Sequence, residues 1–485
     1  MAAIYCRIAD SESKSWVSGG STSASATSLA TTTFNDIGAE RRVLNRAAFG
    51  PNAGNLAHIQ SIGWQAWLEE QLDFSSIDDR TNEEVVEAAN FNAKDVTRLD
   101  RAYLQRCLAS QNQLLMKMTA FWERHFNTDR RKAQNDNEIF EQERFRKLAF
   151  GRFEDLLIGS ATSPAMIRYL DNASNVASAP NEHYAREVLE LHTLGIDGPY
   201  TETDVAELAR VFTGWRVLNN PGPGLYRPQI FNFRIAAHDP GPKSVMTWTT
   251  SGFSNEEGVN EGLTFLRYLA RHPKTIDFIS RKLCASFLEA TPQESEIDRV
   301  KRTLSKPGAT IADAVRVLFE IIANNPRYGR SKSLSNFEFV ISMHRRLGLT
   351  TANLNRMANE LENMGSPLCE FPAPTGLPDA GPRFEAPGVL IERWNFVHDL
   401  ARNSISNSTV DYATLLGSPA PATVLALITH AADLLLDGDL DSKSRDQLQV
   451  WARKRVGSTP TQGQIDGLAP DLFSILLRLP AAQLN

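Results

Sequence analysis

The sequence contains few cysteines, and none of them belongs to a recognisable motif. The four are Cys6, Cys107, Cys284 and Cys369. They lie far apart, whereas zinc knuckles and disulfide frameworks use closely or regularly spaced cysteines. None stands in a motif that would lower its pKa and make it a nucleophile. The cysteines therefore indicate neither a zinc knuckle nor a disulfide-stabilised fold.

Long apolar runs and nucleotide-binding motifs are also missing. No window approaches the run of about 18 apolar residues that a transmembrane helix needs, so no membrane span is expected. The N-terminus has no basic stretch followed by an apolar core, so no secretion signal is visible. The sequence has no Gly-x-Ser-x-Gly elbow, no P-loop and no Gly-rich dinucleotide fingerprint. Nucleotide-driven chemistry and a Rossmann domain are therefore not expected.

The chain has no excess of basic residues. It has 51 Lys and Arg against 57 Asp and Glu, which gives a formal net charge of -6. Binding to nucleic acid needs a basic face, so nucleic acid is not expected as the main partner. The 485 residues, of which 42% are apolar and 22% charged, are typical of a soluble globular protein with a large core.

Three parts are expected along the chain. Residues 1–35 are rich in Ser, Thr, Ala and Gly, and they are predicted to be a flexible arm. Residues 36–405 are predicted to form a mainly α-helical core, because apolar residues recur at spacings of three and four. Within that core, residues 215–254 contain many Pro and Gly, and residues 231–235 alternate with period two, which predicts a small β-hairpin or extended insertion. Residues 406–485 are predicted to be a helical extension packed on the core.

Two local patterns make sharper structural predictions. Apolar positions between residues 95 and 127 recur at helical spacing, which predicts one long helix over that range. The run Thr201-Glu202-Thr203-Asp204 is a variant of the capping box, with Asp in place of the usual Glu, and it predicts that a helix starts there.

Residues 180–195 form the stretch most suggestive of a site. Pro180 suits a first helical turn and Gly195 the position after the last. At about 100° per residue, His183, Glu187 and Glu190 fall within a stripe about 60° wide. This i, i+4, i+7 spacing would let one helix give several ligands to a divalent metal such as Zn, Mn or Fe. The other interpretation is a structural network in which arginines pair with the carboxylates.

A second candidate is the turn His238-Asp239-Pro240-Gly241-Pro242-Lys243. Asp239 could orient the imidazole of His238, and Lys243 could hold an anionic group of a substrate. The opposing interpretation is a turn in which Asp239 accepts backbone hydrogen bonds and Lys243 is solvated. His125, at the end of an apolar helix, could complete a ligand set or could be a buried core histidine.

Several stretches together resemble the family catalogued as domain of unknown function 1800. They keep the order of the family over roughly residues 40 to 405, and they are 44–51, 63–72, 121–126, 169–172, 181–187, 200–205, 212–215 and 238–243. The resemblance implies a fold but no reaction. Relatives often carry Asn where this chain has His183, and they often look exported, frequently with a twin-arginine signal that this sequence does not show. The localisation and the oligomeric state are therefore left open.

The leading functional hypothesis is a hydrolase whose site combines the 183–190 helix face with the 238–243 turn. Glu187, Glu190, His183, His238 and Asp239 would be the catalytic or metal-binding groups.

The residues expected to bind a carbohydrate or another anionic substrate are Arg186, Lys243, Asn181 and Tyr184. One alternative is a metal-free enzyme that cleaves polysaccharides, as a glycosidase or a lyase, with two carboxylates as acid and base. A further alternative is a non-catalytic helical scaffold or binding protein. Convergence of the candidate residues on one cavity would favour an enzyme.

Overall fold

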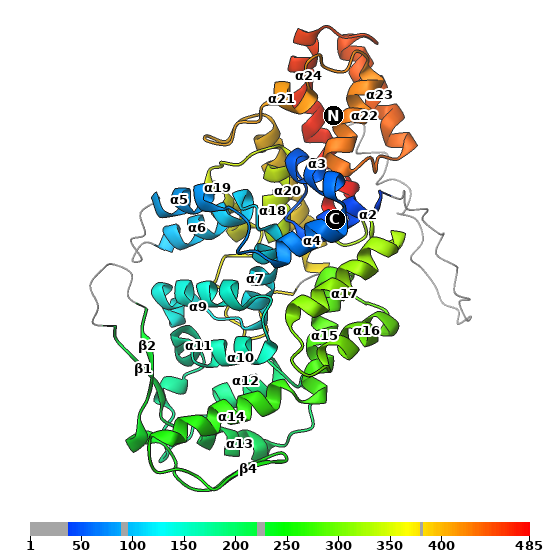
Figure 1. The fold of residues 1–485 in the computed structure, drawn as a ribbon. Helices are drawn as coiled ribbons and strands as arrows, with labels where there is room; N and C mark the ends of the chain where they lie inside the picture. The colour runs from blue at the N-terminus through cyan, green and yellow to red at the C-terminus, as the bar shows by residue number, and fades with distance from the viewer. Residues whose placement is uncertain (1–36, 89–95, 221–227, 379–381) are drawn as a thin grey trace, which may run out of the picture. The chain divides into compact units, whose positions relative to one another are not determined.

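The structure is a computed structural model that describes residues 37–88, 96–220, 228–378 and 382–485. The described residues belong to one compact unit and are mainly α-helical, as the spacing of apolar residues predicts (Figure 1). The predicted N-terminal arm, 1–35, lies outside the described residues. In the part of the chain that is described, no helix combines the length and the apolarity that a membrane span needs.

The first group of helices runs from the start of the described chain to a loop before residue 172. The helices are α2 (Ala39–Ala47), α3 (Ala53–Ile62), α4 (Trp64–Leu72), α5 (Arg80–Ala88), α6 (Val96–Ala109), α7 (Gln113–His125), α8 (Arg130–Ala133), α9 (Asn135–Leu148), α10 (Phe153–Ala161) and α11 (Pro164–Tyr169).

The prediction of a single helix over 95–127 is wrong, because the chain breaks between α6 and α7. The Oγ of Ser110 and the backbone N–H of Gln111 both donate to the carboxylate of Asp79, at 2.7 and 3.0 Å. The side-chain amide of Gln113 donates to the carbonyls of Cys107 and Ser110. The backbone groups of Cys107, Ser110 and Gln111 at the break are thus paired with side chains in place of helical partners.

The second group surrounds the stretch singled out from the sequence. It comprises α12 (His183–Glu190), α13 (Glu202–Val211), α14 (Val259–Ala270), α15 (Pro273–Phe287), α16 (Glu294–Leu304) and α17 (Ile311–Asn324). The capping box at the start of α13 is confirmed, since Thr201 and Asp204 exchange the two expected hydrogen bonds. Helix α12 is shorter than the predicted 180–195 segment, and His192 lies beyond its end, fully buried.

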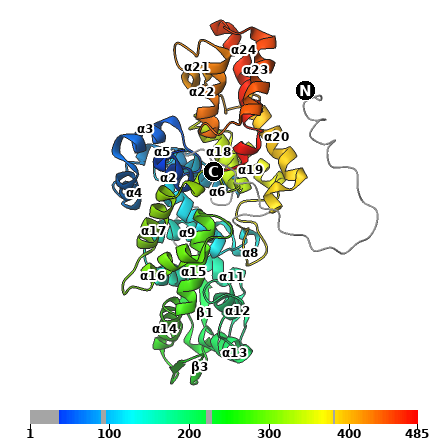
Figure 2. The ribbon, with the colours of Figure 1, turned by 90° about the vertical axis from the view of Figure 1, so that its right-hand side faces the viewer.

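The predicted β insertion is confirmed as two antiparallel hairpins. Strands β1 (Trp215–Leu218) and β2 (Ile230–Phe233) pair with Trp215 opposite Phe233. Strands β3 (Lys243–Val245) and β4 (Trp248–Thr250) pair with Val245 opposite Trp248. Strand β3 lies against α13 and β4 against α14, whereas β1 lies against α11 (Figures 1 and 2).

The last group of helices completes the chain. They are α18 (Asn336–Arg346), α19 (Leu354–Asn363), α20 (Pro387–Ala401), α21 (Tyr412–Leu416), α22 (Val424–Leu436), α23 (Ser442–Val456) and α24 (Gln462–Leu476). Short 3-10 turns are η1 (Asn172–Ser174), η2 (Ile235–Ala237), η3 (Glu256–Gly258), η4 (Pro326–Tyr328), η5 (Pro382–Glu385) and η6 (Pro480–Gln483). The division of the chain at residue 405 stays a prediction.

Two clusters of buried apolar side chains fill the interior. The first joins α2 to α4 with α7, α9 to α17 and the hairpins, and the second joins α6 with α18 to α24. Helix α7 contributes to both, because Phe121 and Trp122 belong to the first cluster while Met116 and Ala120 belong to the second. Since burying an apolar side chain contributes about 1.5–3 kcal/mol, α7 is one of the elements that link the two clusters.

Candidate functional site

The predicted helix face at α12 is on the surface. The side chain of His183 is 66% exposed, and its Nδ1 lies 3.3 Å from Oδ2 of Asp171. Glu187 is half-buried, and burial and the neighbouring charge of Glu190 raise its pKa. Within the described ranges, no three His, Cys, Asp or Glu side chains are grouped so that they could hold a metal ion. The geometry thus lends no support to His183, Glu187 and Glu190 as a ligand set.

The residues predicted to bind substrate near α12 lie in different settings. Tyr184 is buried, with its ring against Phe212 at a centroid distance of 4.9 Å. Asn181 accepts a hydrogen bond from the backbone of His183. Arg186 makes ion pairs with three glutamates, Glu182, Glu190 and Glu202, at 3.2, 3.5 and 2.7 Å. Within the predicted stripe, Glu190 is therefore paired with Arg186 and His183 with Asp171.

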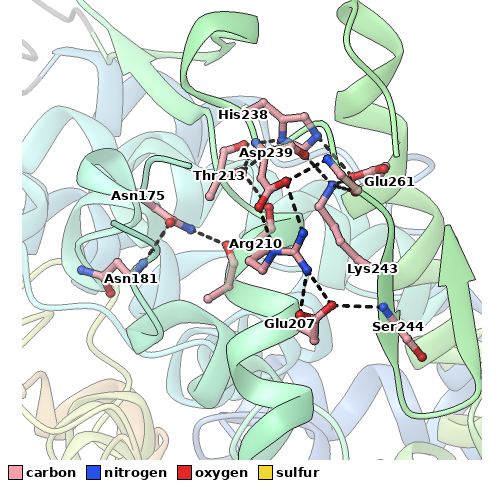
Figure 3. A network of polar contacts seen from close by, with 12 residues as sticks. Asn175, Asn181, Glu207, Arg210, Thr213, His238, Asp239, Lys243, Ser244 and Glu261 are labelled. Carbon is pink, nitrogen blue, oxygen red and sulfur yellow. Dashed lines mark hydrogen bonds and ion pairs between the residues drawn. The ribbon is translucent and has the colours of Figure 1, made fainter. Parts of the chain in front are cut away.

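The 238–243 turn encloses a buried ion pair (Figure 3). Nζ of Lys243 lies 2.7 Å from Oε2 of Glu261 in α14, and both side chains are 0% exposed. Nε2 of His238 lies 3.2 Å from the same oxygen, and Nδ1 lies 2.9 Å from the carbonyl oxygen of Thr213. Sequence reasoning missed Glu261, because nothing in the pattern of α14 distinguishes its buried carboxylate from a solvated one.

Each group around Glu261 has a partner from another element. Lys243 also donates to the carbonyls of Asp239 and Gly241, at 2.5 and 3.0 Å. Burial acts to raise the pKa of Glu261, but the nearby side chains of His238 and Lys243 hold it below its usual value. Because a buried charge is tolerated only when it is paired and hydrogen-bonded, the network fastens the turn to α14.

Asp239 faces a different partner. Its Oδ2 accepts a hydrogen bond from Nε of Arg210 at 2.7 Å, and Arg210 also holds Glu207 in the preceding turn of α13 (Figure 3). Glu207 in turn accepts from the backbone N–H of Ser244 in β3, at 3.2 Å. The two predicted halves of the site thus have separate sets of ion-pair partners, Arg186 on one side and Arg210 and Glu261 on the other.

A cavity of about 100 Å³ lies where the two apolar clusters meet, and we call it the carboxyl cavity. It is bounded by α6, α7, α9, the start of α18, the segment 366–378 and Phe384. Its lining residues are Tyr103, Ala120, Glu123, Arg124, Phe126, Asn127, Thr128, Glu138, Glu141, Gln142, Phe145, Ser335, Asn336, Phe337, Ser366, Pro367, Leu368, Cys369, Phe371, Leu377, Pro378 and Phe384. A mostly apolar pocket with a few converging polar groups is the usual form of a small-molecule site.

Three glutamates face this cavity from two helices. Glu123 comes from α7, while Glu138 and Glu141 stand three residues apart on one face of α9. Glu138 and Glu141 are 6% and 2% exposed. In all three, Oε1 has no hydrogen-bond partner among the described residues. Because an unpartnered buried polar atom is costly, three such atoms in one cavity point to groups that a ligand or water would satisfy.

Burial raises the pKa of every one of these carboxyl groups. The pKa of Glu123 rises to about 7 and that of Glu138 to about 8. Burial, followed by the charge of Glu138, raises the pKa of Glu141 well above its usual value. Oε2 of Glu141 accepts one hydrogen bond, from Oγ1 of Thr128 at 3.2 Å. At neutral pH the cavity therefore holds carboxylic acids as well as carboxylates, a combination typical of acid–base sites.

The proline-rich segment after α19 forms one wall of the cavity and is tied to the chain after α7. Nδ2 of Asn127 donates to the carbonyls of Phe371 and Ala373, both at 3.0 Å. The backbone N–H of Arg130 donates to the carbonyl of Cys369 at 2.8 Å. Gly376 has φ +68° and packs directly on the carbonyl of Arg124. These contacts fix the wall against the glutamates.

The sequence offered only indirect signs of the carboxyl cavity. Glu123 lies in the motif stretch 121–126, and Glu138 and Glu141 lie on an expected helix, but their spacing is equally that of a solvated face. Burial by a segment more than 200 positions further along the chain is what makes them unusual. No local pattern carries that information.

The fold and the cavity define a class: a mainly α-helical protein with a buried acidic cavity between two apolar clusters. The chain belongs to the family described as protein of unknown function (DUF1800), whose model matches residues 42–484. That match confirms the resemblance seen in the sequence and extends it almost to the end of the chain. Searches of curated proteins and of solved structures returned no match.

Proposed function

We propose that this protein is a hydrolase that uses general acid–base catalysis at the carboxyl cavity. The observation that carries the proposal is the set of three glutamates around one cavity, each with a buried carboxyl oxygen that has no hydrogen-bond partner among the described residues. Hydrolysis needs one group that accepts a proton from water and one that donates a proton to the leaving group. Carboxyl groups whose environments set their pKa values apart supply both roles.

The roles follow from the protonation states near neutral pH. Glu138, with a pKa of about 8, is mostly protonated and would donate its proton to the leaving atom. Glu123, with a pKa of about 7, is ionised in a large fraction of molecules and would take a proton from the attacking water. The water's oxygen then bonds to the substrate as the leaving group departs with the proton from Glu138, so the reaction consumes one water and no other reactant.

A glycosidic bond is the bond we propose for cleavage. Pairs of Asp or Glu are the usual catalytic groups of glycosidases. Phe126, Phe337 and Phe371 are among the lining residues and make part of the cavity wall apolar, as the apolar face of a sugar requires. This reaction is the metal-free alternative that the sequence suggested, but we now assign it to a different set of carboxyl groups.

The face of α12 with the 238–243 turn remains the other place proposed for the same activity. Glu187, half-buried and with a raised pKa, is the group there that favours it. A metal-dependent version would need ligands beyond His183, Glu187 and Glu190, because those three do not form a group suited to a metal ion.

The test is a panel of chromogenic α- and β-glycosides, assayed with the unaltered protein and with the variants Glu138→Gln and Glu187→Gln. The proposal predicts hydrolysis that falls at least about a hundredfold in Glu138→Gln, as expected when a general acid is removed, and stays within about twofold in Glu187→Gln. The reverse pattern would assign the chemistry to the α12 face. Absence of hydrolysis with every glycoside would contradict the proposal and favour a binding protein.

A further inference from the structure

The carboxyl cavity contains one more buried acid than acid–base hydrolysis needs. With Glu138 and Glu123 in those roles, Glu141 has no task in proton transfer. It is also the more deeply buried of the two α9 glutamates, at 2% exposure, and its Oε1 lacks a partner among the described residues. A carboxyl group in this setting is costly to ionise unless a positive charge comes to lie beside it.

The positive charges around the glutamates belong to arginines with other partners. Arg130 pairs with Asp100 and Glu370. Arg144 donates to the carbonyl of Gly159 and to Thr162, at 2.7 and 3.0 Å. The lining itself carries three carboxyl groups and the single guanidinium of Arg124. Full ionisation would therefore leave the cavity with an excess of negative charge.

The apolar part of the lining suits a cation as well. Aromatic rings attract a cation that lies over their faces, by about 0.5–2 kcal/mol each. Phe126, Phe145, Phe337, Phe371 and Phe384 all line the cavity, and the face of Phe371 already carries one cation, the guanidinium of Arg383, 5.6 Å from the ring centroid. Carboxylates together with aromatic rings form the environment in which proteins usually hold organic ammonium groups.

We propose that the carboxyl cavity binds an organic cation, an ammonium group carried by the substrate, with Glu141 as its counter-charge. The inference rests on the proposed function only because it assigns the ammonium group to the substrate of that reaction. The test itself measures binding and does not require turnover. On binding, Glu141 releases its proton to solvent and the carboxylate faces the cation, while Glu138 and Glu123 keep their catalytic protonation states.

The experiment compares choline with 3,3-dimethylbutan-1-ol, which has the same shape but carbon in place of the charged nitrogen. Choline cannot lose a proton from nitrogen, so it tests charge alone. Binding is followed by isothermal titration calorimetry at pH 7. The variants are Glu141→Gln and, as a control on the same helix, Glu143→Gln, whose native carboxylate pairs with Arg106 and Arg146.

The expected result is that choline binds at least tenfold more tightly than the neutral alcohol, and that this preference disappears in Glu141→Gln but persists in Glu143→Gln. Equal affinity for the two probes, no binding of either, or a preference that survives in Glu141→Gln would overturn the proposal. The comparison in the unaltered protein decides the question even if a variant folds poorly.

The two proposals can fail separately. Choline binding that depends on Glu141, without hydrolysis of any substrate, would leave the cation site in place and contradict the hydrolase. Hydrolysis that depends on Glu138, without a preference for choline, would leave the hydrolase in place and contradict the cation site.

Discussion

Replacing Glu138 with glutamine should stabilise the protein relative to the unaltered chain, by an amount that increases with pH. Glu138 is 6% exposed, its Oε1 has no partner among the described residues, and its pKa is about 8 in place of 4.5. Glutamine keeps the size and shape of a protonated glutamate but does not ionise. The substitution therefore removes the titration and leaves the packing of α9 nearly unchanged.

The direction follows from the protons bound in each state. A pKa that is higher in the folded than in the unfolded protein gives a contribution to stability that is complete below about pH 4.5. It declines as the pH rises and is lost at about pH 8, because the unfolded chain releases the proton first. One pKa unit corresponds to about 1.4 kcal/mol. The stability advantage of Glu138→Gln should therefore grow by roughly 3 to 4 kcal/mol between pH 5 and pH 8.

Urea unfolding followed by circular dichroism at both pH values gives this difference directly. Glu143→Gln is the matched control, because Glu143 lies on the same helix but its carboxylate is paired with Arg106 at 2.7 Å. Its effect should be destabilising or neutral at both pH values. An effect of Glu138→Gln that does not change between pH 5 and pH 8 would contradict this prediction, because it would mean that Glu138 is already ionised in the folded protein.

Two further substitutions test the wall of the cavity and the buried ion pair. Gly376→Ala should lower the free energy of unfolding by about 2 kcal/mol, because φ is +68° and a Cβ would collide with the carbonyl of Arg124. The control Gly388→Ala, where a Cβ meets open space, should change the free energy of unfolding by less than about 1 kcal/mol. Equal effects of the two substitutions would contradict the contact between Gly376 and Arg124. Glu261→Gln should lower the free energy of unfolding at pH 7 by about 3–5 kcal/mol, measured with denaturant, because it leaves the ammonium of Lys243 buried without its counter-charge. A loss below about 1 kcal/mol would show that Lys243 is solvated.

Local features of the fold could be predicted from the sequence because they depend on neighbours in the chain. The capping box joins Thr201 to Asp204, three residues apart, and it is present. The alternation of residues 231–235 with period two predicts the β insertion, which also depends on residues that are close in the chain. The break between α6 and α7 could not be predicted in this way, since it depends on Asp79 from outside either helix.

The candidate site depends still more on distant contacts. The stripe of His183, Glu187 and Glu190 was visible from helical periodicity, but periodicity cannot distinguish a surface face from a buried one. The residues that flank Glu138 and Glu141 in the sequence likewise do not distinguish them from glutamates on a solvated helix face. They are buried because α18 and the segment after α19 cover them, and burial is what changes their chemistry.

The central claim is that the glutamates of the carboxyl cavity hold protons at neutral pH. Carbon-13 NMR of protein labelled at the glutamate carboxyl carbon measures this without a substrate. We expect resonances that titrate near pH 7 for Glu123 and near pH 8 for Glu138, each lost in the corresponding Gln variant. If every glutamate resonance titrates below about pH 5, the usual range for this side chain, the glutamates of the cavity are ionised in the folded protein at neutral pH, and the proposed acid–base roles are wrong.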